Sequence, residues 1–181
     1  MADNAWFVIT GGPSVGKTTL LEELTRRGYT TIPEAARHVI DEDLAKGHTL
    51  THIRANEKAF QEKVARYKAN TEASLDRKRI LFLDRGMQDT LAYMQAYAYT
   101  VAPWLQKLVK KARYKKVFLL EPLDTFAQDY ARTENDFIRE RLQKLLETAY
   151  IEHDMEPVRV PAVSPAERAD FILSYLEKMS L

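Results

Sequence analysis

Short apolar runs alternate with longer amphipathic stretches along the chain. Residues 6–9, 80–83 and 117–120 are continuous apolar runs of strand length, and residues 29–32 and 158–160 are short stretches rich in β-branched side chains. Continuous apolar runs of this length are typical of strands that are buried on both faces of a parallel sheet. The stretches between the runs repeat apolar residues every three or four positions, which is the spacing of an amphipathic helix. This alternation predicts an α/β fold, a doubly wound sheet of about five parallel strands flanked by helices.

Helices are expected wherever the three- and four-residue spacing holds. The expected ranges are 17–27, 34–47, 51–75, 87–99, 103–113, 137–149 and 164–179. Gly28 is suited to end the first of these, because glycine readily adopts the left-handed conformation that follows a helix. One long amphipathic helix is expected to start near Thr51. Ser164 and Glu167 form a capping box around Pro165, which marks the start of the last helix.

Composition narrows the classes of function. The 181 residues are 45% hydrophobic and 29% charged, with no linker rich in Pro, Gly or Ser, which is typical of one folded domain covering residues 1–181. A formal net charge of +1 provides no electrostatic argument for binding nucleic acid or an anionic membrane. The absence of cysteine excludes disulfides, thiolate metal ligands and a cysteine nucleophile. No apolar run approaches the roughly 20 residues of a membrane span, and no signal peptide is recognised, so a cytoplasmic location is the default expectation.

Residues 11–18 fit the phosphate-loop pattern G-x-x-x-x-G-K-[ST], between an expected strand and an expected helix. Glycines allow successive backbone N–H groups to converge on a phosphate at the positive end of a helix. Lys17 would lie between the terminal phosphates of ATP, and the Thr18 hydroxyl would bind Mg²⁺. The alternative is a glycine turn that enters an ordinary helix. The predicted ATP-binding residues are Gly11, Gly12, Pro13, Ser14, Val15, Gly16, Lys17, Thr18 and Thr19.

Two carboxylates follow expected strands, at the edge of the sheet where the phosphate loop also lies. Asp84 comes directly after the apolar run 80–83, where a carboxylate can bind Mg²⁺ or accept a proton from an attacking hydroxyl. The alternative for Asp84 is a cap on the next helix. Glu34 follows the second strand and is a candidate general base or ligand of the acceptor hydroxyl, the alternative being an acid in the first turn of a helix.

Arginines next to these carboxylates are candidates for contacts with phosphate. Arg85 follows Asp84 and could bind a substrate phosphate or the transferring group, or form a structural ion pair with Asp84 or Asp89. Arg37 lies one helical turn after Glu34 and shares its face, so it is a candidate substrate-binding residue.

A polar segment, residues 125–141, is expected to form a helical lid over the phosphates. Phosphoryl transfer needs positive charge that is supplied as the site closes, and Arg132 is the first candidate to supply it, with Arg139 and Arg141 as alternatives. A solvated helix face would explain the same arginines without a catalytic role. The lysine-rich residues 107–116 are explained most simply as the exposed face of a helix.

Four blocks of the sequence together resemble a known family. They are residues 11–18, the segment Pro33-Glu34-Ala35-Ala36-Arg37, the segment Leu83-Asp84-Arg85-Gly86, and residues 118–124 followed by Arg132-Thr133-Glu134. In these blocks the chain resembles the small AAA-like ATP-binding domain family, which is related to the ribosylnicotinamide kinases among the P-loop kinase-like proteins. The resemblance covers nearly the whole chain. It implies a P-loop NTPase fold and an ATPase or kinase activity, with the substrate unspecified.

A looser similarity links the chain to deoxynucleoside kinases. In that family a Glu-Pro at the second strand supplies the base, a Phe-Gln on a long helix reads the nucleobase, and a Glu-Arg-Ser ends the third strand. Glu34, the pair Phe60-Gln61 and the triplet Asp84-Arg85-Gly86 follow in comparable order here. Two departures matter: proline precedes Glu34 rather than following it, and Asp84 replaces a glutamate. The base therefore stays open between Glu34 and Asp84, and Gln61 is either a base reader or a polar residue beside the core stripe of its helix.

The leading functional hypothesis is a small-molecule kinase dependent on Mg²⁺, which transfers the γ-phosphate of ATP to a nucleoside- or nucleotide-like acceptor. The acceptor would lie between Glu34, Gln61 and Arg85, and the segment around Arg132 would close over it. The alternative is an ATPase or nucleotide-dependent switch that acts on a macromolecular partner. A nucleotide-binding scaffold without activity is a third hypothesis. No N-K-x-D motif is present, which disfavours a GTPase, and the sequence leaves a monomer and a homodimer open.

Overall fold

The computed structural model describes residues 4–122 and 136–179, without the side chains of residues 136–140. Its centre is a five-stranded sheet in the order β2-β3-β1-β4-β5, and every neighbouring pair in it is parallel. The strands are β1 (Trp6–Thr10), β2 (Thr30–Ile32), β3 (Leu81–Asp84), β4 (Lys116–Leu120) and β5 (Val158–Val160). The predicted doubly wound α/β fold is confirmed.

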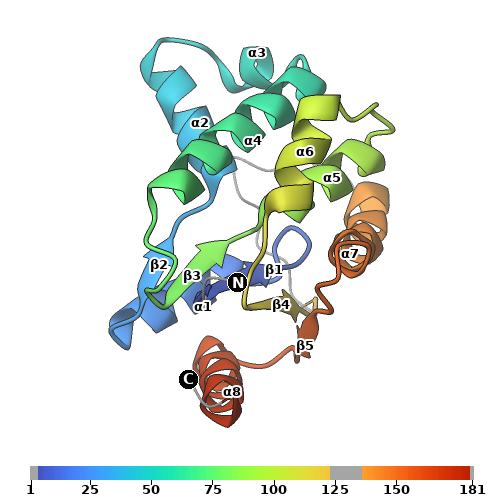
Figure 1. The fold of residues 1–181 in the computed structure, drawn as a ribbon. Coiled ribbons are helices and arrows are strands. Elements are labelled where there is room, and N and C mark those ends of the chain that lie inside the picture. The colour runs from blue at the N-terminus through green and yellow to red at the C-terminus, as the bar shows by residue number, and fades with distance from the viewer. Residues whose placement is uncertain (1–3, 123–135, 180–181) are drawn as a thin grey trace.

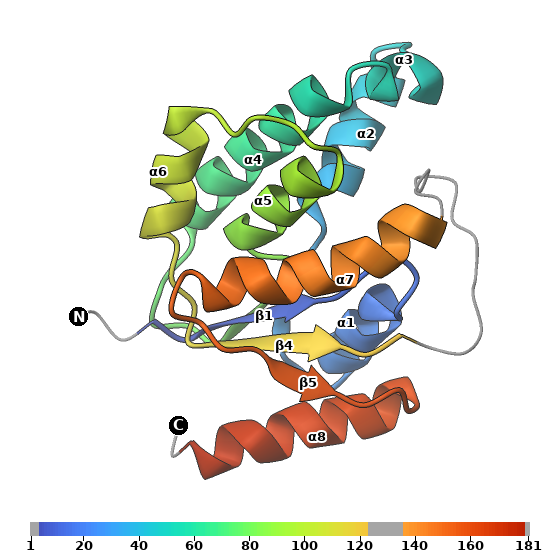
Figure 2. The ribbon, with the colours of Figure 1, turned by 90° about the vertical axis from the view of Figure 1, so that its right-hand side faces the viewer.

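Helices cover both faces of this sheet. They are α1 (Lys17–Arg26), α2 (Ala35–Ala45), α3 (Leu50–Arg54), α4 (Glu57–Ser74), α5 (Met87–Ala96), α6 (Pro103–Lys111), α7 (Asp136–Ile151) and α8 (Pro165–Lys178). Figure 1 and Figure 2 show α8 on one face, and α7 with α5 and α4 on the other. Within the described ranges, no helix is both long enough and apolar enough to cross a bilayer.

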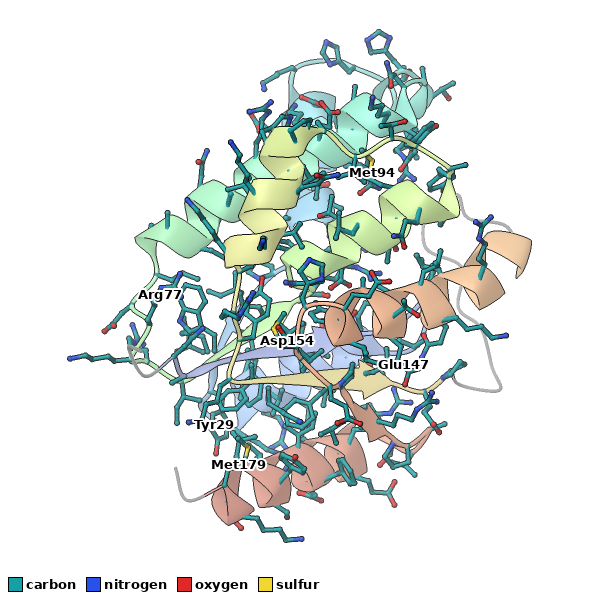
Figure 3. All side chains as sticks on the ribbon, turned by 45° about the vertical axis from the view of Figure 1, so that its right-hand side comes forward. Tyr29, Arg77, Met94, Glu147, Asp154 and Met179 are labelled. Atoms are coloured by element: carbon teal, nitrogen blue, oxygen red, sulfur yellow. The ribbon has the colours of Figure 1, made fainter. Side chains whose placement is uncertain are left out.

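The central strand shows why the apolar runs are continuous. Successive side chains of a strand point to opposite faces. Trp6 and Val8 therefore join the core under α5, α6 and α7, while Phe7 and Ile9 join the core under α1 and α8. All four side chains are completely buried. Tyr29 extends the second core, with its ring edge-on to that of Phe82 at 5.5 Å between centroids. It lies on the same side of the sheet as Met179, the C-cap of α8 (Figure 3).

A third apolar cluster stands apart from these two and joins α2 to α4. Its buried members are Ala35, Val39, Ile40, Phe60 and Val64. Because α2 follows β2 and α4 leads into β3, this pair of helices projects beyond the carboxyl ends of the strands (Figure 1). The pair forms one wall of the space next to the phosphate loop.

The prediction of a single long helix from Thr51 is wrong. The chain forms two helices in this region, α3 and α4, with a break at residues 55–56. The Asn56 side chain accepts a hydrogen bond of 3.0 Å from the Ala59 N–H and caps α4. A short polar side chain of this kind competes with the helical backbone bonds and favours a new N-terminus. The apolar spacing continues across the break, so periodicity alone did not reveal it. The capping box at Ser164 and the left-handed Gly28 (φ 91°) are present as expected.

Candidate functional site

The phosphate loop connects β1 to the N-terminus of α1, in the predicted strand–loop–helix arrangement. Gly11 has a φ of 144°, and a Cβ added there would lie 2.9 Å from Val15 Cγ2 and 3.0 Å from the Leu120 carbonyl oxygen. No side chain fits at that position. Gly16, with a φ of 87°, is the N-cap of α1. The two glycines of the motif are thus required by close packing and by backbone conformation.

The Lys17 side chain points back toward the phosphate loop and bonds to its backbone. It is 1% exposed, and its ammonium group donates to the carbonyls of Gly11 at 3.0 Å and Gly12 at 2.6 Å. Carbonyl oxygens compensate part of the cost of burying this charge. Thr18 is exposed in the first turn of α1 and lines a pocket together with Glu34 and Asp84.

Two side chains from distant helices hold the loop in place. Gln143 of α7 accepts a hydrogen bond from the Gly12 N–H at 2.8 Å and donates to the Leu120 carbonyl at 3.0 Å, so it joins the loop to β4. Arg168 of α8 is 1% exposed and donates to the backbone carbonyls of Val15, Pro161 and Glu121. Neither residue is evident from the sequence, because neither belongs to a motif and both bond to residues far away along the chain.

Asp84 ends β3 with its side chain buried. Its Oδ1 atom has no hydrogen-bond partner among the described residues. Burial, together with the negative charge of Glu34, raises the pKa of this carboxyl to about 6. Asp84 does not cap the next helix, which was the alternative interpretation. Gly86 is the N-cap of α5, and its N–H donates to the Asp89 carboxylate at 2.9 Å. Asp84 is a buried carboxylate with an oxygen available for a ligand.

Arg85 is buried and connects three parts of the site. It donates to Glu34 Oε1 at 2.8 Å, to Asp89 Oδ1 at 3.1 Å and to the Gly11 carbonyl at 3.1 Å. Its φ of 67° is in the left-handed region, a conformation that is uncommon for a side chain of this size. The expected ion pair with Asp89 is present, and Glu34 is a second carboxylate partner.

Asp89 was expected only as a partner of Arg85, and the structure makes it the centre of a buried network. Besides Arg85 and Gly86, it accepts hydrogen bonds from the Thr10 hydroxyl at 2.6 Å and from the Tyr150 hydroxyl. These bonds link β1, α5 and α7 directly behind the phosphate loop. The network holds in place the turn that carries Asp84 and Arg85.

The four predicted acceptor residues, Glu34, Arg37, Gln61 and Arg85, line one pocket, and Pro13 of the phosphate loop lines it too. The walls come from α2, α4 and α5. The structure thus brings together residues that lie far apart in the sequence, and it places them beside the loop.

Gln61 is 5% exposed and lines this pocket. Its side-chain amide donates to Glu57 at 2.8 Å, and Glu57 in turn pairs with Arg54 at 2.7 Å. The Arg54 guanidinium lies 4.7 Å from the centroid of the Phe60 ring. Arg54 and Glu57 were not singled out from the sequence, where they read as an ordinary pair on a helix surface.

The predicted lid lies largely outside the described residues. Arg132 is outside them, and so is the side chain of Arg139. The last part of the segment, residues 136–141, begins α7, where Arg141 is exposed. The role expected of these arginines stays a prediction.

Comparison with known proteins agrees with this architecture. A family model described as an AAA domain matches residues 6–168. No match is found among curated proteins. Thymidylate kinase from Ehrlichia chaffeensis has a similar structure, with a TM-score of 0.67 and 11% identity over 96% of this chain and 98% of that one. Deoxyadenosine kinase from M. mycoides with bound dATP gives a TM-score of 0.64 and 12% identity over 96% of this chain and 99% of that one.

NadR protein in complex with NR gives a TM-score of 0.63 and 17% identity over 87% of this chain. This chain spans only 44% of that NadR chain. At such identities the likeness to solved structures establishes the fold. The family match covers most of the chain and confirms the resemblance carried by the four sequence blocks. The chain belongs to the AAA domain family and has the P-loop NTPase fold of nucleoside and nucleotide kinases.

Proposed function

We propose that this protein is a small-molecule kinase that transfers the γ-phosphoryl group of ATP to a nucleoside- or nucleotide-like acceptor. One observation carries the proposal: the phosphate loop borders a separate walled pocket that holds Glu34, Gln61 and Arg85. A protein that only hydrolyses ATP has no need of such a second pocket. Kinases require two adjacent sites, since catalysis of phosphoryl transfer consists mainly of positioning donor and acceptor.

ATP would bind along the phosphate loop, with its phosphates at the N-terminus of α1. Lys17 would move from the carbonyls of Gly11 and Gly12 to the phosphates, because a phosphate oxygen is a stronger partner for an ammonium than a neutral carbonyl. Gln143 and Arg168 would hold the loop backbone in its shape during this exchange.

Thr18 and Asp84 are the residues that would hold Mg²⁺. Their fit rests on the free Oδ1 of Asp84 and on the pocket that both residues line. Among residues 4–122 and 141–179, whose side chains the structure describes, no group of three or more His, Asp or Glu could hold a metal ion by itself. That pattern suits Mg²⁺, which is usually bound by one or two carboxylates together with substrate phosphates. When bound, the ion would neutralise charge on the phosphate oxygens.

Glu34 and Asp84 are the two carboxylates that could take a proton from an acceptor hydroxyl. Glu34 is paired with Arg85 at 2.8 Å, which fixes the orientation of its carboxylate. Asp84 has a pKa raised to about 6, which is nearer to neutral pH and suits proton transfer. Arg85 would then orient Glu34 or contact the transferring group, and Arg132 would act from the lid.

The experiment that tests the proposal is a screen with labelled ATP, in the presence of Mg²⁺, against nucleosides, nucleotides and related acceptors. We expect a labelled acceptor product well above the background of ATP hydrolysis. Lys17→Ala should abolish the product with the fold retained, as checked by circular dichroism. Turnover that no acceptor stimulates would overturn the kinase and favour the ATPase or switch. Undiminished turnover in Lys17→Ala would contradict the assignment of the phosphate loop.

A further inference from the structure

Lys68 on α4 is a buried cation for which the function proposed above provides no role. Its side chain is 7% exposed, and its ammonium group donates to the Gly86 carbonyl at 2.9 Å. It forms no ion pair with any carboxylate in the described parts of the chain. Burial lowers the pKa of this group. An ammonium has three N–H donors, so two of them remain for another partner.

The buried arginines that line the pocket with it have carboxylate partners. Arg85 is neutralised by Glu34 and Asp89, and Arg54 is neutralised by Glu57. Three carboxylates attract the Lys68 ammonium group through space without forming an ion pair with it, namely those of Asp89, Glu72 and Asp84. A buried charge that lacks a direct partner is costly unless a ligand completes its environment.

Lys68 borders the acceptor pocket at the end next to the strands. It lines that pocket together with Gln61 and Arg85, and it lines a neighbouring one together with Asp84. Gln61 and Lys68 are seven positions apart on α4, so they share a face of the helix about 10 Å apart along its axis. The pocket therefore has an amide at one end and an ammonium at the other, close to where the phosphoryl group would be transferred.

We propose that the acceptor carries an anionic phosphate bound by Lys68, which makes it a nucleoside monophosphate rather than a neutral nucleoside. This inference rests on the proposed kinase function. In the transfer, an oxygen of the acceptor phosphate forms a bond to the γ-phosphorus of ATP, and the bond from that phosphorus to the β–γ bridging oxygen breaks. The products are ADP and the acceptor diphosphate. A phosphate has a second pKa of about 6, so the attacking dianion has no proton to lose. With this acceptor, Asp84 would act by holding Mg²⁺ and Glu34 by orienting Arg85, and neither would act as a general base.

The test compares matched pairs of nucleosides and their 5′-monophosphates in the wild type and in Lys68→Met. Methionine keeps the length of the side chain and removes the charge. We expect phosphorylation of monophosphates, with a KM for the monophosphate that rises about tenfold or more in Lys68→Met, as for the loss of one charged contact. The KM for ATP should change much less than the KM for the monophosphate. Lys68→Arg should restore part of the affinity.

Lys63→Met is the matched control on the same helix. Lys63 pairs with Asp43 at the surface, its side chain is 42% exposed, and it lies outside the pocket, so its removal should leave the monophosphate KM unchanged. Equal or better use of neutral nucleosides, with no effect of Lys68→Met on the monophosphate KM, would overturn the inference. If the variant fails to fold, calorimetry on the wild type tests whether the pocket binds a phosphate. Monophosphates should then bind more tightly than the corresponding nucleosides. If neither class is phosphorylated, the kinase proposal fails, while this binding comparison still tests the role of Lys68.

Discussion

At the scale of single residues, Asp84 combines burial, an oxygen without a hydrogen-bond partner and a raised pKa. Each of these properties opposes stability in the protein without ligands, because a buried carboxylate loses its hydration and gains too few hydrogen bonds in return. A residue that served only stability would be expected to satisfy both oxygens. The arrangement is understandable if a cation occupies the space next to Oδ1 during the reaction.

Asp84→Asn should therefore stabilise the ligand-free protein while impairing its activity. We expect the free energy of unfolding in urea at neutral pH to rise by about 1–3 kcal/mol, since one pKa unit corresponds to about 1.4 kcal/mol. Turnover should fall by about 100-fold or more. Glu34→Gln is the matched comparison, and it should destabilise the protein because Arg85 loses a carboxylate partner. Equal small effects of the two substitutions on turnover would remove both carboxylates from the chemistry.

Some of the residues at this site could be predicted from the sequence, and others could not. Asp84 and Glu34 could be predicted because each follows a strand, and the carboxyl ends of parallel strands form the edge of the sheet where ligands bind. Asp89 could be predicted only as a partner of Arg85. Lys68 carried no local signal, since a lysine within an amphipathic helix usually faces water. The burial of Lys68 is decided by how α4 packs against the turn at Gly86.

At the scale of elements, the break between α3 and α4 positions the pocket that is lined by Glu34, Gln61 and Arg85. Asn56 caps α4, and the residues that follow place Phe60 and Gln61 at the pocket while α3 turns away from the axis of α4. A continuous helix would carry Arg54 along that axis. The cap thereby determines where the pocket ends.

Two asparagines on this part of the chain should respond to alanine in opposite directions. Asn56→Ala should lower the free energy of unfolding by about 1 kcal/mol, because it removes the N-cap. Asn70→Ala, at an exposed position inside α4, should be neutral or stabilising by about 0.5 kcal/mol, because alanine has the higher helix propensity. Chemical denaturation measures both. A destabilisation shared equally by the two variants would argue against the cap.

At the scale of the whole molecule, the phosphate loop depends on elements from the second half of the chain. Gln143 of α7 and Arg168 of α8 bond to its backbone, and the Asp89 network supports it from β1, α5 and α7. The loop is therefore coupled to the stability of the entire fold. A ligand bound at the loop should stabilise all of it.

MgATP should raise the thermal midpoint of the wild type. At a concentration of about 100 times its Kd the added stability is about 2.7 kcal/mol, which corresponds to about 5–10 °C for a chain of this length. Scanning calorimetry or a dye-based thermal shift measures the change. Lys17→Ala should lose most of the shift, and ATP with a metal chelator should give a smaller one. A full shift in Lys17→Ala would mean that ATP binds elsewhere.

The sequence by itself determined the strands, most of the helices and the phosphate loop. These features depend on residues close together in the chain, through hydrogen-bonding geometry and the burial periodicity of each element. Only the tertiary structure decided the order β2-β3-β1-β4-β5, the pairing of Arg85 with Glu34, and the pocket between α2, α4 and α5. Those depend on contacts between residues far apart in the sequence, whose partners are chosen by the packing of whole elements. The phosphate loop could therefore be predicted from local sequence, whereas only the fold showed that the residues expected to bind an acceptor line one pocket.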